Sequence, residues 1–92
     1  MRGSDPAAQL LRTLTRHARG QAVTLSHEGM IAWSSATFIG GQHRIAVRGD
    51  PPVAWLEALG DADLPMHGCF VASVEIARTT DGVMLTVLVL DD

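Results

Sequence analysis

The chain has 92 residues and contains no lysine, asparagine or tyrosine and only one cysteine. The single Cys69 excludes an internal disulfide and argues against a zinc site built from cysteines. All seven basic residues are arginine, a bias typical of a high-GC bacterial genome, and the net charge is −3. An acidic chain without lysine lacks the electrostatic footprint of a general nucleic-acid binder.

Long apolar runs are absent as well. No stretch approaches the roughly 20 apolar residues that span a membrane, and the start of the chain has no hydrophobic signal core. We therefore expect a cytoplasmic protein with no membrane contact. With 47% hydrophobic and 18% charged residues, the composition predicts one globular domain over residues 1–92. A chain of this length has a thin core, so association with a second chain would help to cover it.

The segment 70–92, FVASVEIARTTDGVMLTVLVLDD, is the most informative part of the chain. Its two apolar runs meet at Asp81 and Gly82, and Asp-Gly is typical of a two-residue hairpin turn that needs positive φ. The pairs in this register are Thr80 with Val83, Arg78 with Leu85, Ile76 with Val87 and Val74 with Val89. A three-residue loop with a bulge at Gly82 is the alternative, but it divides the apolar residues less cleanly.

Both faces of this predicted hairpin carry apolar side chains. One face is almost wholly apolar, with Phe70, Ala72, Val74, Ile76, Leu85, Val87 and Val89. The other face mixes polar residues with Met84, Leu88 and Leu90, because side chains alternate along a strand. These second-face residues need cover from a partner subunit or from a folded-back segment.

Two helices are signalled by their first residues. Asp5 is a good N-cap, Pro6 suits the first helical position, and Gly20 ends the helix. The buried stripe of this helix is predicted to be Ala7, Leu10, Leu11, Leu14 and Ala18. A second helix is predicted from a cap at Asp50 to Gly60, with Val53, Leu56 and Leu59 buried and Trp55 flanking them.

Three short strands are predicted between the helices, over residues 22–26, 30–38 and 42–48. Glu28-Gly29 and Gly40-Gly41 are the expected turns. The helix-facing side of these strands is predicted to carry Val23, Leu25, Ala32, Ser34, Ala36, His43, Ile45 and Val47. The order α-β-β-β-α-β-β then predicts an α+β two-layer sandwich with an antiparallel sheet.

The leading functional hypothesis is a non-catalytic protein-interaction or homodimerisation domain. It rests on apolar side chains that point to both sides of the sheet in a chain too short to cover both. The predicted interface residues are Ile31, Trp33, Met84, Leu88 and Leu90. A homodimer or a protein partner is therefore expected, and no cofactor is implied.

A second hypothesis is a small-molecule-binding or enzymatic domain with a pocket between helix and sheet near His43 and Ser34. His43 is predicted to point inward, where an imidazole can act as a base, but no nucleophile can be named, so no catalytic residue is assigned. His27 is expected to be exposed in a turn.

Metal sites are not supported by the sequence. His67 and Cys69 lie on one side of a strand, but two ligands alone do not make a site. Asp61 and Asp63 lack the remaining ligands of a calcium loop.

A third hypothesis is single-stranded nucleic-acid binding through Trp33, Arg44 and Arg48, which are predicted on one face of the sheet. Aromatic and arginine side chains on a sheet can stack on bases and hold phosphates. The same residues also fit cation–π packing or a subunit contact, and the missing basic cluster argues against nucleic acid.

Overall fold

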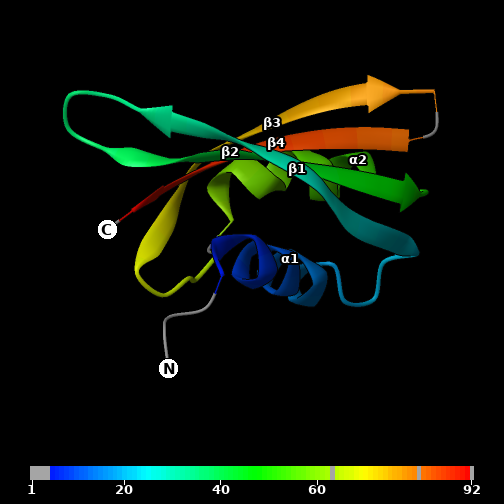
Figure 1. Ribbon diagram of the computed structural model, residues 1–92. Helices are drawn as coiled ribbons and strands as arrows, with labels where there is room; N and C mark the ends of the chain where they lie inside the picture. Colours follow the sequence, from blue (N-terminus) through cyan, green and yellow to red (C-terminus); the bar gives the residue numbers. More distant parts are fainter. Residues whose placement is uncertain (1–4, 63, 81, 92) are drawn as a thin grey trace.

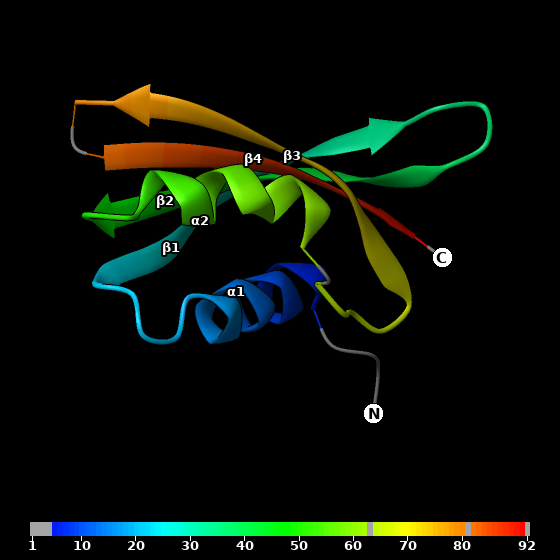
Figure 2. The ribbon, with the colours of Figure 1, turned by 180° about the vertical axis from the view of Figure 1, so that it is seen from behind.

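The fold is one antiparallel sheet with two helices on the same side (Figures 1 and 2). The computed structural model describes residues 5–62, 64–80 and 82–91. The elements are α1 (Pro6–His17), β1 (Val23–Ser34), β2 (Ile39–Gly49), α2 (Val53–Ala58), the 3-10 turn η1 (Leu59–Asp61), β3 (Cys69–Thr79) and β4 (Gly82–Asp91). The strand order is β1-β2-β4-β3. The predicted α+β class with an antiparallel sheet is confirmed, with the order α-β-β-α-β-β. No helix among the described residues is long and apolar enough to cross a membrane.

The first helix begins as the sequence predicts, but it ends at His17 with Ala18 as its C-cap, before the predicted end at Gly20. The Asp5 side chain accepts a hydrogen bond from the Ala7 amide (3.2 Å), and Pro6 lies in the first turn, where its missing N–H costs nothing. Leu10 and Leu14 are completely buried against the sheet. Gln9 and Thr13 are buried beside them and hold the loop before β3: Gln9 bonds both backbone groups of His67, and the Thr13 hydroxyl donates to a carbonyl of this loop.

The prediction of three short strands between the helices is wrong, because two long strands form instead. The expected turn at Glu28-Gly29 is a β-bulge inside β1, where the register shifts between His27 and Gly29. A bulge absorbs one extra residue without ending the strand. The pattern of apolar residues therefore breaks at this point although the strand continues.

The expected turn at Gly40-Gly41 also lies inside a strand. The chain reverses at residues 35–38, where the Ser35 hydroxyl accepts hydrogen bonds from the amides of Thr37 (3.3 Å) and Phe38 (3.0 Å). A serine side chain can organise a turn in this way without glycine. Gly40 instead pairs with Leu90, at one end of the ladder between the central strands β2 and β4.

The second helix is shorter than predicted. It begins at Val53 after Pro52, and no side chain caps it, so the expected cap at Asp50 is wrong. Leu56 and Leu59 are buried as predicted, but Val53 is exposed. Trp55 is half-buried, and its ring stacks on His17 of α1 with centroids 5.9 Å apart.

The C-terminal hairpin forms, but its register differs from the prediction by two residues. Thr79 pairs with Gly82 and Ile76 with Leu85, while Asp81 lies outside the described residues. Gly82 is the first residue of β4, and a Cβ there would meet the Val47 carbonyl of β2. A shift of two residues preserves the side-chain faces.

The core lies between the helices and one sheet face. A bulge between Val71 and Ser73 moves Phe70 to the opposite face, contrary to the prediction. The core cluster consists of Leu10, Leu14, Ile45, Val47, Leu56, Leu59, Leu64, Cys69, Val83, Leu85, Val87 and Val89.

Candidate functional site

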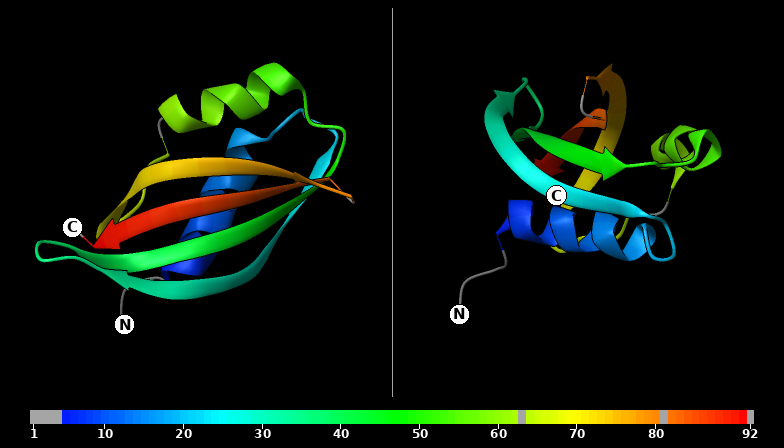
Figure 3. Two further views of the ribbon diagram at one scale, coloured as in Figure 1. Left: turned by 90° about the horizontal axis from the view of Figure 1, so that it is seen from above. Right: turned by 90° about the vertical axis from the view of Figure 1, so that its right-hand side faces the viewer.

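The sheet face opposite the helices, which we call the open face, has no helix over it in the described part of the chain (Figure 3). The pairing places Ile31, Trp33, Met84 and Leu88 there, as the sequence predicts. Ile31 is 63% exposed, and the other three are half-buried. The open face thus has an apolar surface of its own, with side chains from β1 and β4.

Leu90 differs from the other predicted interface residues. It is also on the open face, but it is only 6% exposed. It pairs with Gly40 on one side and with Phe70 on the other. The ring of Phe70 in turn meets Phe38 edge-on, with centroids 6.0 Å apart. Of the two expected sources of cover for Leu90, a partner subunit or this chain itself, the chain itself supplies it, and a role of Leu90 in an interface stays a prediction.

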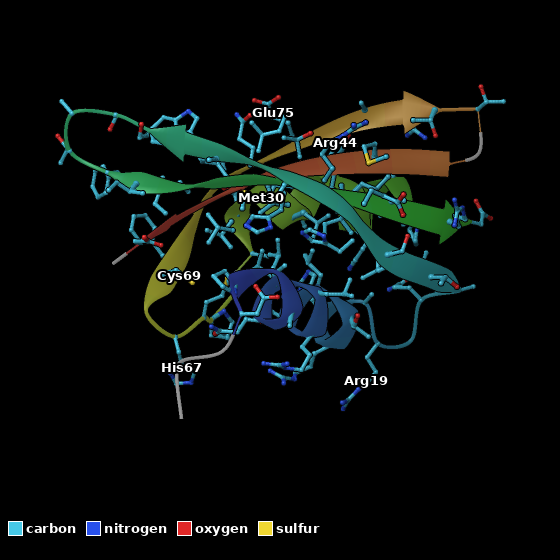
Figure 4. The ribbon with its side chains drawn as sticks, viewed as in Figure 1. Arg19, Met30, Arg44, His67, Cys69 and Glu75 are labelled. Atoms are coloured by element: carbon cyan, nitrogen blue, oxygen red, sulfur yellow. The ribbon has the colours of Figure 1, made fainter. Side chains whose placement is uncertain are left out.

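Two opposite charges cross the middle of the open face in one row. Arg44 of β2 and Glu75 of β3 both pair with Thr86 of the central strand β4. Both side chains are exposed, and Figure 4 shows them on the side of the sheet away from α1. Thr86 therefore lies between a positive and a negative charge at the same level of the sheet.

The distal end of the β1–β2 hairpin projects beyond α1 (Figure 1), and Met30 lies at its base, above α1 (Figure 4). We call residues 30–39 the arm. Its exposed apolar residues are Met30 (53%), Ile31 (63%), Phe38 (41%) and Ile39 (65%). No charged residue occurs from Gly29 to Gln42. A projecting, uncharged and apolar hairpin is typical of a surface that associates with another protein.

Trp33, Arg44 and Arg48 share the open face, as predicted, but the register keeps them apart. Trp33 lies opposite Gly40, which is four residues from Arg44, or about 13 Å along the strand. Arg48 is a further four residues away. These side chains do not form one compact clamp for a nucleotide.

His43 points inward as predicted and is 3% exposed. It hydrogen-bonds His27 of β1, with Nε2 of His27 and Nδ1 of His43 2.9 Å apart. His27 is thus a half-buried strand residue and not an exposed turn residue. Burial lowers the pKa of His43 below its ordinary value, the neighbouring His27 lowers this pKa further, and the Asp5 carboxylate opposes the shift.

A cavity of about 190 Å³ lies beside His43, lined also by Asp5, Met30, Gly41 and Asp91. It is smaller than the roughly 300–1,000 Å³ of ordinary ligand pockets. Ser34, which was expected to share a pocket with His43, is exposed and does not line it.

The other candidate ligands do not come together. Cys69 is buried and His67 exposed, and no group of three possible metal ligands occurs among the described residues. Asp63, half of the weighed calcium pair, lies outside those residues.

Two features of these surfaces were missed at the level of sequence. The contact between His27 and His43 was not predicted, because the bulge at Glu28 changes which residues of β1 face the helix. The Arg44–Glu75 row depends on strand order, which the sequence does not specify. Comparisons with protein families, with curated proteins and with solved structures found no match to this chain.

Proposed function

We propose that the protein is a non-catalytic homodimerisation domain whose two copies pack through their open faces. The observation that carries the proposal is the uncovered sheet face with apolar side chains around one row of opposite charges. Two sheets that pack face to face keep their strands within about 30° of each other. The open face supplies the side chains for such packing.

The arrangement of the charges suits a two-fold dimer. Because β2 and β3 flank β4, a two-fold axis parallel to β4 lays β2 of one copy over β3 of the other. Arg44 then faces Glu75 of the second copy, and the same pair recurs on the other side of the axis. An interface of this kind must match its own copy, and here each charge meets its opposite.

The central strand fits the same geometry. The axis lays β4 over its own copy, so Met84 meets Met84 and Leu88 meets Leu88. Burial of apolar surface of this kind is the main driving force of association. The charges at the sides then set the register of the two copies, a role that suits charged groups in interfaces.

A pair of substitutions tests which face of the sheet is used. We expect the protein to have twice the mass of one chain in light scattering, and Leu88→Arg to reduce it to a single chain, because Leu88 meets its own copy across the axis. Ile39→Arg is the control, because Ile39 is an exposed apolar residue that belongs to the helix-facing side. A single chain in the unmodified protein, or equal effects of both substitutions, would show that the proposal is wrong.

A charge exchange tests the two-fold arrangement separately. Arg44→Glu should weaken the dimer at low salt, because glutamate then faces glutamate on both sides of the two-fold axis. The double variant Arg44→Glu/Glu75→Arg should restore it, and sedimentation velocity measures both. If the double variant is as weak as the single one, the two charges do not meet across the interface.

A further inference from the structure

A second surface lies between α1 and the start of β1, away from the open face. It is a groove of about 850 Å³. Its apolar lining includes Leu11, Val23 and Leu25, which are half-buried, and Ala18, which is buried. The groove follows α1 for most of its length, from Ala8 to the residues after its C-terminus.

The rim of the groove is positively charged. Arg12, Arg16 and Arg19 line it and are exposed, and no acidic residue lines it. Figure 4 shows Arg19 beyond the C-terminal end of α1. Within the described part of the chain, none of the three arginines forms an ion pair. In a chain with a net charge of −3, this concentration of positive charge is local to α1.

One wall of the groove is the edge strand β1, which has a sheet neighbour on one side only. The Asp50 amide donates to the Ala22 carbonyl (3.3 Å). In an antiparallel strand the backbone groups of successive residues point alternately toward and away from the neighbouring strand. Since the Ala22 carbonyl points toward β2, Val23 and Leu25 direct their amides and carbonyls away from it. Their side chains line the groove. The edge therefore offers hydrogen-bonding groups next to an apolar floor.

We infer that this groove binds an extended acidic peptide segment of a partner protein, which adds to the sheet beside β1. Strand addition supplies backbone hydrogen bonds, and alternate side chains of the peptide enter the groove. Carboxylates on the peptide meet the arginines, whose guanidinium groups match carboxylate geometry. The apolar floor and the free edge favour a peptide over a nucleic acid, since neither feature serves a phosphate backbone.

The test uses a fluorescent peptide of alternating glutamate and valine, followed by fluorescence anisotropy with the full chain. We expect salt-sensitive binding that is lost with a lysine-valine peptide and with a backbone N-methylated glutamate-valine peptide. Arg12→Glu/Arg16→Glu should weaken binding about tenfold or more, because attraction becomes repulsion at two contacts. Arg48→Glu/Arg78→Glu changes the net charge equally at exposed sites outside the groove and should leave binding unchanged.

Three outcomes overturn the inference. These are absence of binding at low salt, equal binding of the N-methylated peptide, and binding of oligothymidylate in preference to the peptide. Leu88 lies outside the groove, so Leu88→Arg should bind the peptide normally even where it abolishes dimerisation. The groove and the open face are in this way tested independently.

Discussion

Gly40→Ala is expected to lower the free energy of unfolding by at least about 2 kcal/mol, the range of severe overpacking. A Cβ at this position would lie 2.8 Å from Cα of Leu90 and would also meet the Val89 carbonyl. Both contacts are with the backbone of β4, which cannot rotate away as a side chain can. The central strands β2 and β4 must separate to admit the methyl group. A chain of this size has a total stability of about 5–14 kcal/mol, so the loss should be plain in urea unfolding.

Gly41→Ala is the matched control. Its Cβ would lie 2.6 Å from the Met30 sulfur and 2.9 Å from Met30 Cγ. Met30 is half exposed on the arm, so its side chain can move aside. Alanine also restricts the unfolded chain more than glycine does. We expect a change within about 1 kcal/mol, and a loss as large as that of Gly40→Ala would show that the backbone contact is not the cause.

The same two glycines show where the sequence misleads. Gly-Gly is a common turn signal, but glycine also occurs where two backbones approach closely. Only the neighbouring strand distinguishes these roles, and β4 lies more than forty residues away along the chain. By contrast, α1 and the C-terminal hairpin depend on local patterns. Asp5, Pro6 and the alternation in β4 were therefore sufficient to predict them.

The predictions for the open face also divide into those that depend on local patterns and those that depend on contacts between distant residues. The open-face positions of Ile31, Trp33, Met84 and Leu88 follow from alternation within strands, and the structure places them there. The burial of Leu90 depends on contacts between separate strands, which local alternation does not reveal. Pairings between distant residues thus account for most of what the sequence could not provide.

The stability of the protein should fall as the pH drops below about 6.5, the ordinary pKa of histidine. Burial and the neighbouring His27 lower the pKa of His43 in the folded state. Between the two pKa values the unfolded chain binds a proton that folded His43 does not, so unfolding becomes more favourable. The stabilisation is fully present above 6.5 and declines toward the lower, folded pKa. The slope for one proton is at most about 1.4 kcal/mol per pH unit.

His43→Gln tests this prediction, because glutamine is polar but does not titrate. We expect the variant to lose much of the decline between about pH 7 and pH 5, a window that lies above the ordinary pKa values of carboxylates. His67→Gln is the control, since His67 is exposed and its substitution should leave the pH profile unchanged. Urea unfolding at several pH values measures all three proteins. If His43→Gln declines as steeply as the unmodified protein, then the buried imidazole is not the group that couples folding to pH.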